Sequence, residues 1–515
     1  MSSGLSWTIL IPYYVVLGVL ALYGVHRSWL LVLWWKNRSA APEAPPDPEV
    51  WPAVTVQLPL YNEMYVAARL IDAVCRLDYP REYLEIQVLD DSTDETRDIV
   101  AGKVAEHRAR GFDIHHLHRT DRTGFKAGAL AAGTLRARGR FLAVFDADFV
   151  PPADFLRKVI PHFLGPDRER VGMVQARWDH LNRSFSLLTR IQAILLDGHF
   201  LIEHTARHRS GRFFNFNGTA GVWRREVIDD AGGWQHDTLT EDLDLSYRAQ
   251  LAGWKFLYLP EVAVPSELPV DVNGFKSQQH RWAKGSIQTG RKLIGRVLRS
   301  RLPWAVKAEA FVHLTNNVSY VLMVLLSLLV FPAMALRQDA SSRTLLLVDV
   351  PLFLAATVSV LAFYVASQVA LGEGWRQRIR TLPALMGLGI GLSINNARAV
   401  IAGFFQDGGV FHRTPKYSIA DSIADSVEGQ EKGWRAKRYR VGRNLFALVE
   451  GLFALYLACC LVWAVKDGMW YSLPFLLLFV HGHCYIVLLT LLSNDLGWNR
   501  EPEKDLAPAL ETSGS

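Results

Sequence analysis

Polar residues that suit metal and phosphate chemistry follow short apolar runs in the first third of this sequence. The run Glu85–Leu89 leads into Asp91, and the run Phe141–Phe145 leads into Asp146 and Asp148. Two carboxylates separated by one residue can hold a hard divalent cation and leave other positions free for phosphate oxygens. Such a cation would neutralise the negative charge that develops on a departing diphosphate.

Another apolar run and a lysine add to this pattern. The run Val54–Leu58 leads into Tyr61 and Glu63, and Lys126 stands between two glycines. Glycines let the backbone approach a ligand closely, and an ammonium can meet phosphate as a point charge. Because ligands bind at the carboxyl ends of parallel strands, we expect all these groups in one crevice.

The triplet Thr240–Glu241–Asp242 supplies a further acidic group at the expected start of a helix. Asp242 could act as a general base on an acceptor hydroxyl. It could equally cap the helix N-terminus, which is the commoner use of Asp at such a position. This segment alone leaves both uses open.

Two aromatic-rich segments complete the candidate site. In Phe213–Arg224, glycines and aromatic residues surround Asn217 and Gly218, which suits a buried strand turn or the wall of a sugar pocket. In Ser277–Gly285, a guanidinium and an indole lie where soluble sequence passes into apolar sequence. An aromatic face stacks well on a sugar ring, although a Trp–Arg pair is also typical of a membrane interface.

The elements that must position these groups are predicted to form a membrane-attached α/β domain. The chain has 515 residues, 50% of them hydrophobic, and a mean hydropathy of +0.10, which favours membrane segments. Between residues 53 and 270, β-branched runs alternate with amphipathic helices, which predicts a mostly parallel sheet with helices on its faces. The four cysteines lack the spacing of a disulfide framework or a zinc site.

Apolar runs on both sides of this domain predict one N-terminal and about four C-terminal transmembrane helices. Residues 1–38 form the anchor, residues 39–52 a linker rich in Ala and Pro, and residues 306–494 contain the later helices. Basic residues directly after the anchor mark the cytoplasmic side. We therefore expect the N-terminus outside, the α/β domain in the cytosol and the C-terminus inside.

Three further segments are expected to lie along the membrane surface. Residues 380–405 are apolar but have basic flanks on both sides, so both ends should be cytoplasmic. Phe185–Arg209 and residues 271–305 show helical spacing of apolar side chains. The alternative for these helices is ordinary core packing. Residues 495–515 are acidic and are expected to be disordered.

Four of these motifs, in this order, resemble the D, DxD, TED and QxxRW signature of processive family 2 glycosyltransferases. They are Asp90–Ser92, Asp146–Asp148, Thr240–Asp242 and Gln278–Trp282. Within the cellulose synthase superfamily, Phe216–Arg224 is most similar to the cellulose-synthase-like A type, the glucomannan and mannan synthases. The resemblance implies a cytosolic GT-A domain with a Rossmann-like sheet.

The resemblance also implies a role for each matching residue. Asp242, Glu241 and Asp148 would be catalytic, with Asp242 as the base and Asp148 as the ligand of Mg²⁺ or Mn²⁺. The residues that would bind the nucleotide-sugar are Tyr61, Glu63, Asp91, Lys126 and Asp146.

The acceptor end and a mobile loop are implied in the same way. In residues 406–440, the segment Val410–Lys416 resembles the FxVTxK gating loop of the family, with Phe411, Thr414 and Lys416 as its functional residues. The residues that would line the acceptor site and channel are Asn217, Gly218, Gln278, Arg281 and Trp282.

The implied activity is that of an inverting transferase of the plasma or inner membrane. It would add hexosyl units from GDP-mannose or UDP-glucose to a growing β-linked polysaccharide and translocate the product. Its partners would be the nucleotide-sugar, the polysaccharide, the lipid bilayer and accessory export proteins, without nucleic acid. Two alternatives stay open: a glycolipid synthase similar to ceramide glucosyltransferase, which adds one sugar, and a membrane protein that only binds nucleotide-sugar or moves a partner's polymer.

Overall fold

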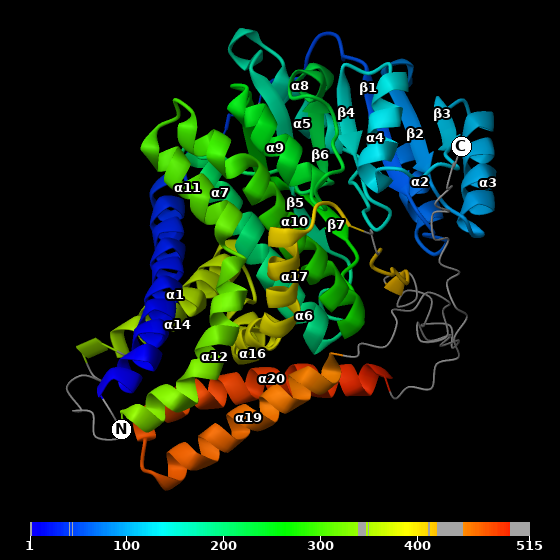
Figure 1. Ribbon diagram of the computed structural model, residues 1–515. Coiled ribbons are helices and arrows are strands. Elements are labelled where there is room, and N and C mark those ends of the chain that lie inside the picture. Colours follow the sequence, from blue (N-terminus) through cyan, green and yellow to red (C-terminus); the bar gives the residue numbers. More distant parts are fainter. Residues whose placement is uncertain are drawn as a thin grey trace, which may run out of the picture.

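A sheet with its covering helices forms one end of the molecule, and long apolar helices form the other (Figure 1). This arrangement confirms the predicted fold class, an α/β domain with apolar helices before and after it in the chain. The computed structural model describes residues 3–40, 42–43, 45–337, 347–348, 350–409, 413–419 and 446–494.

The sheet has seven strands in the order β3-β2-β1-β4-β6-β5-β7. Strand β6 runs antiparallel to both its neighbours, and the other pairs are parallel. The expectation of a mostly parallel sheet is therefore correct except at β6. The strands are β1 (Val54–Leu60), β2 (Leu84–Asp90), β3 (Ile114–His118), β4 (Phe141–Val144), β5 (Val171–His180), β6 (Gly221–Arg224) and β7 (Lys255–Ser266).

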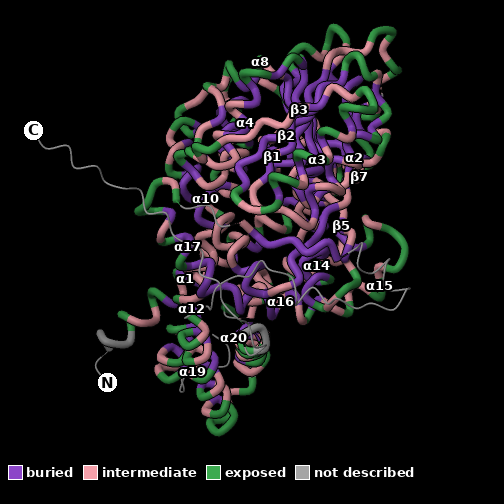
Figure 2. Tube along the Cα trace, turned by 90° about the vertical axis from the view of Figure 1, so that its right-hand side faces the viewer, coloured by how far each residue is buried: buried purple, intermediate pink, exposed green. Residues whose placement is uncertain are grey.

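Helices cover both faces of this sheet because its central strands are apolar on both sides. In β4, Phe141 and Ala143 belong to one core, whereas Leu142 and Val144 belong to the other. Figure 2 shows this buried layer running through the domain. The helices against the first core are α2 (Ala67–Cys75), α3 (Thr96–Ala109) and α5 (Phe155–Val159). Those against the second are α4 (Phe125–Arg136), α8 (Arg225–Asp230) and α9 (Glu241–Leu251).

A second group of helices lies between the sheet and the apolar helices (Figure 1). The predicted helix Phe185–Arg209 is divided into α6 (Leu187–Asp197), the π-helix η4 (Gly198–His204) and α7 (Thr205–Arg209). Helix α10 (Val272–Arg299) begins where Asp271 accepts a hydrogen bond from the Gly274 N–H over 2.7 Å. Helix α11 (Trp304–Thr315) packs against α10.

Five helices in the described part of the chain are long and apolar enough to cross a membrane. A further pair of helices, Trp375–Gly391 and Ser393–Phe405, meets at a bend of 42°. A bent pair of this kind can span the membrane or lie outside it, so its placement along the membrane surface stays a prediction. The five helices and the helices of the bent pair are α1 (Ser3–Asn37), α12 (Val318–Leu336), α14 (Val350–Leu371), α15 (Trp375–Arg378), α16 (Leu382–Gly391), α17 (Ser393–Phe405), α19 (Ala447–Lys466) and α20 (Leu473–Asn494). Helix α17 packs against α10 and α12.

The pair α19 and α20 exposes several large apolar side chains. The two helices run side by side across the end of the molecule that lies away from the sheet (Figure 1). Leu448, Leu455 and Val462 of α19 are 72%, 61% and 55% exposed. Large apolar side chains that are this exposed suit contact with lipid and not with water.

Candidate functional site

The carboxyl ends of β1, β2 and β4 open onto one cavity, as the sheet topology requires. Helices α9 and α10 close its other side. Every site residue predicted from the sequence lines this cavity except Phe411, which lies outside the described residues. The lining residues from that prediction are Tyr61, Glu63, Asp91, Lys126, Asp146, Asp148, Asn217, Gly218, Glu241, Asp242, Gln278, Arg281, Trp282, Thr414 and Lys416.

Two arginines that the sequence analysis missed hold one end of the cavity. Arg119 donates hydrogen bonds from Nε and Nη2 to the two carboxylate oxygens of Asp91, over 2.8 and 2.6 Å. The guanidinium of Arg122 lies 3.2 Å from the centre of the Tyr61 ring. Both arginines follow β3 in a loop, where Arg is an ordinary surface residue, so the sequence carries no signal for them. Together they fix the side chains of Asp91 and Tyr61.

Lys126 lies in the first turn of α4 and connects two walls of the cavity. Its Nζ donates to Asp146 Oδ1 over 2.5 Å and to the Gly218 carbonyl oxygen over 2.9 Å. Burial alone would lower the pKa of Lys126, but Asp146 and Glu241 raise it above its ordinary value. Burial also raises the pKa of Asp146, against the opposing effect of Lys126. A buried ammonium at a helix N-terminus is well placed to receive phosphate.

A second cation–carboxylate pair involves the segment that resembles the gating loop. Lys416 Nζ lies 2.7 Å from Asp148 Oδ2 and donates to the Glu267 carbonyl oxygen over 2.5 Å. The buried Glu267 carboxylate accepts hydrogen bonds from the N–H groups of Tyr417 and Ile419, over 2.9 and 3.2 Å. Glu267, another residue that the sequence analysis missed, therefore anchors this segment against the cavity.

Glu63 forms the third pair, with Arg413 Nη1 at 3.2 Å from Glu63 Oε2. Burial raises the pKa of Glu63 to about 8, even though Arg413 and Lys416 favour the ionised form. The cavity therefore holds a carboxyl group that the surrounding cations satisfy only in part.

Asp242 lies in the first turn of α9 with its carboxylate in the cavity. Its Oδ1 accepts a hydrogen bond from the Leu243 N–H over 2.8 Å, so it contacts its own helix end as a capping acid would. Burial and the neighbouring Glu241 raise the pKa of Asp242 to about 7. Gly218 has a φ of +82°, and a Cβ there would lie 3.1 Å from Asp242 Oδ2. The glycine leaves space beside the carboxylate.

Helix α10 brings Gln278, Arg281 and Trp282 to the cavity. It lies so close to the start of α9 that a Cβ at Gly285 would stand 2.6 Å from Thr240 Cγ2. Burial lowers the pKa of Arg281, while four carboxylates of the cavity oppose that shift. The close contact at Gly285 holds these three side chains opposite Asp242.

Two histidines from the π-helix η4 orient Asn217. His204 Nε2 lies 2.6 Å from Asn217 Oδ1, and His199 Nε2 lies 2.9 Å from Asn217 Nδ2. Burial lowers the pKa of His204 well below its ordinary value, so its ring is neutral. The sequence analysis missed both histidines. The two histidines are five residues apart, and side chains at that spacing lie on the same face only where the helix widens to a π-helix.

The comparisons with known proteins agree with this geometry. Residues 52–285 match the family model described as "Glycosyltransferase like family 2". Glucomannan 4-beta-mannosyltransferase 7 of Arabidopsis thaliana is 33% identical over 417 residues, which cover 79% of this chain and 71% of that protein. The chain belongs to glycosyltransferase family 2. A probable glucomannan 4-beta-mannosyltransferase 9 of Oryza sativa subsp. japonica is 32% identical over 451 residues, covering 84% and 81% of the two chains.

A solved structure shares the fold of this glycosyltransferase. The mannosyltransferase from Pyrobaculum calidifontis, in complex with GDP-Man and Mn²⁺, has a TM-score of 0.52 and 20% sequence identity. The match covers 76% of this chain and 99% of that protein. The predicted family and the predicted class of enzyme, a transferase, are thus confirmed.

Proposed function

We propose that this glycosyltransferase transfers mannose from GDP-mannose to the growing end of a β-linked mannan or glucomannan. The observation that carries the proposal is the meeting of Asp242, Lys126 and the Arg281–Trp282 pair in one cavity. A base, a phosphate partner and a sugar-stacking surface are what transfer to a polysaccharide end needs. The choice of mannose rests on the printed names of the relatives.

The chemistry follows from the positions of these side chains. Asp242 takes the proton of an acceptor hydroxyl while the hydroxyl oxygen attacks the anomeric carbon of the donor. The bond from that carbon to the diphosphate oxygen breaks, and the anomeric configuration inverts to β. A pKa of about 7 leaves a useful fraction of Asp242 ionised at neutral pH and still basic enough to accept a proton. Lys126 and Arg281 stabilise the charge on the departing diphosphate.

The residues around Asp148 fit a divalent cation. Its carboxylate faces the Lys416 ammonium at 2.7 Å, so this position already accepts positive charge. Carboxylate oxygens suit Mg²⁺ or Mn²⁺, and Asp148 with Asp146 beside it would hold the ion. When bound, the ion would supply neutralisation of the diphosphate charge. Lys416 and Thr414 would then be available to contact the diphosphate.

The proposed route of the product starts at Trp282 and continues among the apolar helices. Helix α10 carries the acceptor side of the cavity and packs against α17, which in turn packs against α12. In the part of the chain that the structure describes, five candidate membrane helices precede or follow the domain. With the N-terminus outside and the C-terminus inside, the cavity faces the cytosol and the polymer leaves through the membrane.

The test uses the purified full chain in liposomes. Release of nucleoside diphosphate is measured with GDP-mannose, UDP-glucose and GDP-glucose, and the product is sized and its linkage determined. We expect release from GDP-mannose and a high-mass, mannanase-sensitive product, both lost in Asp242→Asn. A single-sugar lipid, or transfer only from UDP-glucose, would overturn the proposal.

A further inference from the structure

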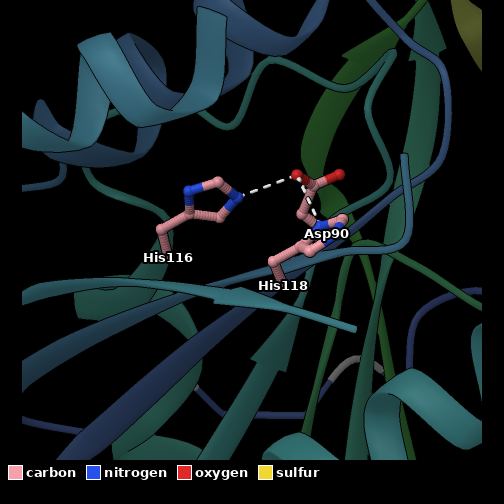
Figure 3. A group of neighbouring side chains, drawn as sticks. All are labelled: Asp90, His116 and His118. Carbon is pink, nitrogen blue, oxygen red and sulfur yellow. Dashed lines mark hydrogen bonds and ion pairs between the residues drawn. The ribbon is translucent and has the colours of Figure 1, made fainter. Parts of the chain in front are cut away.

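Three side chains at the edge of the sheet form a cluster that the transfer reaction does not use. Asp90 is the last residue of β2, and His116 and His118 lie two residues apart on the neighbouring strand β3. Alternate residues of a strand point to the same face. Figure 3 shows both imidazoles directed at the Asp90 carboxylate.

The distances within this cluster are short. Asp90 Oδ2 lies 2.8 Å from His116 Nε2 and 3.5 Å from His118 Nδ1, and all three atoms lie within 4.8 Å of one another. The Asp90 side chain is fully buried, while the two histidine side chains are 17% and 21% exposed. None of the three residues lines the cavity, although Asp91, which follows Asp90 in the chain, does line it.

Hydrogen bonding accounts for only part of this arrangement. Asp90 Oδ1 accepts the Ser92 N–H over 2.9 Å, and Oδ2 pairs with His116. His118 Nδ1 is buried and has no hydrogen-bond partner among the residues that the structure describes, although it lies 3.5 Å from the same oxygen. A buried ring nitrogen without a partner costs free energy, because it gives up its hydrogen bond to water. A cation placed between the three atoms would satisfy it.

The donor set and its spacing suit a borderline transition metal. Two imidazoles and one carboxylate form a common three-ligand site, with remaining positions open to water. Metal–ligand bonds of about 2.0–2.1 Å in a tetrahedral site place the ligand atoms about 3.3 Å apart. The Asp90–His118 distance is close to this value, and the Asp90–His116 distance needs to open by only about half an ångström.

We propose that Asp90, His116 and His118 bind Zn²⁺ or a similar transition-metal ion at a site distinct from the cation position at Asp148. The ion would join the carboxyl end of β2 to that of β3. Arg119, which donates hydrogen bonds to the Asp91 carboxylate, directly follows His118 in the chain. The ion would therefore stiffen the loop that positions Arg119. The proposal does not depend on which sugar the enzyme transfers.

The experiment uses the untagged full chain in detergent after removal of metal with a chelator. Asp148→Asn is present in every sample so that the cation position of the cavity contributes little. Binding of Zn²⁺ is measured by calorimetry, and Co²⁺ is used as a coloured probe whose visible absorption reports imidazole ligands. We expect one ion per chain, and an affinity lowered by about 100-fold or more in His116→Ala and in His118→Ala, since loss of outer partners alone costs 10–100-fold.

His115→Ala is the matched control. His115 lies on the same strand but on its other face, where it pairs with Asp113 at 2.8 Å. This variant should bind Zn²⁺ as the parent does. No stoichiometric binding by the parent protein, or equal binding by the His118→Ala variant, would overturn the proposal.

A second measurement avoids substitutions that harm folding. Diethyl pyrocarbonate modifies exposed imidazoles, and the modified positions are mapped by mass spectrometry with and without Zn²⁺. We expect Zn²⁺ to protect His116 and His118 and to leave His115 reactive. Equal modification of His118 in both samples would contradict the site.

Discussion

Two buried polar regions of this glycosyltransferase affect their carboxyl groups in opposite ways. In the cavity, burial raises the pKa of Glu63 to about 8 and that of Asp242 to about 7. Where α6 meets α14, burial would also raise the pKa of Asp197, but hydrogen bonds from Arg183 outweigh it and lower the pKa. Burial is common to both regions, so the partners make the difference.

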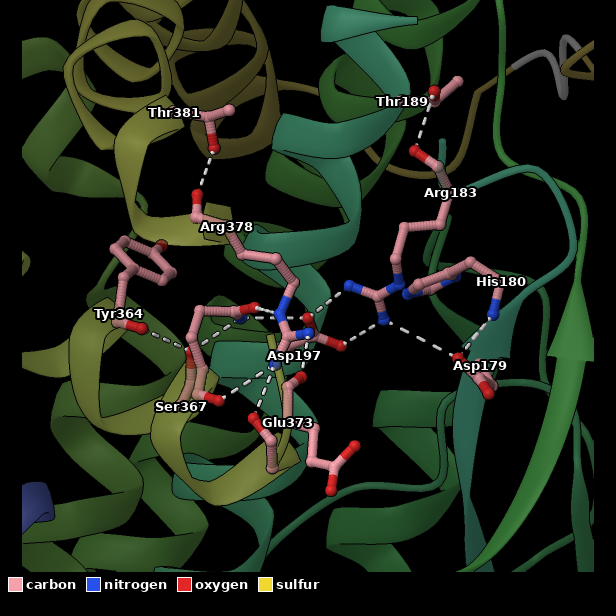
Figure 4. A network of polar contacts seen from close by, with 12 residues as sticks. Asp179, His180, Arg183, Thr189, Asp197, Tyr364, Ser367, Glu373, Arg378 and Thr381 are labelled. Carbon is pink, nitrogen blue, oxygen red and sulfur yellow. Dashed lines mark hydrogen bonds and ion pairs between the residues drawn. The ribbon is translucent and has the colours of Figure 1, made fainter. Parts of the chain in front are cut away.

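In the network around Asp197, both carboxylate oxygens of Asp197 have hydrogen-bond partners (Figure 4). Arg183 donates to both of its carboxylate oxygens over 2.7 and 2.9 Å, and Gln368 Nε2 donates over 3.0 Å. Arg378 Nε donates to Gln368 Oε1 over 2.7 Å and extends the network into the segment after α14. The network joins α6, beneath the sheet, to an apolar helix, so its role is to hold the two parts together.

In the cavity, by contrast, the carboxyl groups of Glu63 and Asp242 are incompletely compensated. Glu63 has its nearest cation at 3.2 Å, and Asp242 has another carboxylate beside it. Substrate, metal and acceptor would bring the groups that these residues lack. The direction of the pKa shift therefore distinguishes carboxyl groups that bind ligands from carboxyl groups that stabilise the fold. Burial alone does not distinguish them, because both kinds are buried.

The largest effect is expected for Asp242→Asn. Loss of the general base should lower transfer by about 10²–10⁴-fold, while donor binding survives. The thermal midpoint should stay the same or rise, because the substitution removes a charge that the fold disfavours. Diphosphate release and thermal unfolding are measured on the same preparation. A variant that loses activity only because it unfolds would contradict the assignment.

A substitution in the paired network should show the reverse pattern. Asp197→Ala leaves Arg183 half-buried without its partner and should lower stability by about 3 kcal/mol. Activity per folded molecule should change little. The control is Asp179→Ala, whose carboxylate is 39% exposed and lies 3.6 Å from Arg183, and which should cost less than about 1 kcal/mol. Unfolding is followed by circular dichroism, and equal losses in the two variants would remove the distinction.

The sequence was sufficient to predict the strand ends that carry Tyr61, Asp91 and Asp146, because apolar runs followed by polar clusters obey the geometry of parallel sheets. It was not sufficient for the antiparallel β6, since four residues set no direction. The order of motifs also located Asp242 and Arg281, and the structure places them in one cavity.

The partners of these residues could not be predicted, for a physical reason. Arg119, Arg122 and Glu267 belong to residue types that are ordinary on surfaces, and only tertiary contact selects their role. His199 and His204 face Asn217 because η4 widens to a π-helix, which helical periodicity does not predict. The pKa of Glu63 likewise depends on burial by segments far away in the chain.

The two regions should also differ in how pH affects them. Glu63 and Asp242 have raised pKa values in the folded state, so they contribute stability that falls as pH rises from about 4.5 to about 8. Asp197 has a lowered pKa, so its contribution is present above about 4 and is lost below that pH. Transfer should instead rise with pH, about tenfold per unit up to about 7, as Asp242 loses its proton.

Thermal midpoints measured between about pH 5 and about pH 8 test whether the contribution of Glu63 to stability falls as pH rises. Over this interval the wild-type protein should lose stability relative to Glu63→Gln, and buried histidines with a lowered pKa, such as His204, affect both proteins alike. Asp197→Asn should leave the slope over the same interval unchanged, because Asp197 stays ionised throughout. A constant difference between the thermal midpoints of the wild type and Glu63→Gln would show that Glu63 is already ionised at low pH.

The smallest effect is expected at Arg119, which shapes the cavity without belonging to the reacting groups. Arg119→Lys keeps the positive charge but removes the bidentate pair of hydrogen bonds to the Asp91 carboxylate, because a Lys ammonium cannot reproduce the planar geometry of a guanidinium. We expect the KM for the nucleotide-sugar to rise about tenfold and kcat to change less than about twofold, because positioning of the donor is affected more than the transfer step. Arg110→Lys, whose exposed guanidinium pairs with Glu106, is the control and should change neither constant. If kcat fell and KM stayed the same, Arg119 would act on the transition state. Arg119 would then belong with the reacting groups of the cavity and not with the residues that only position them.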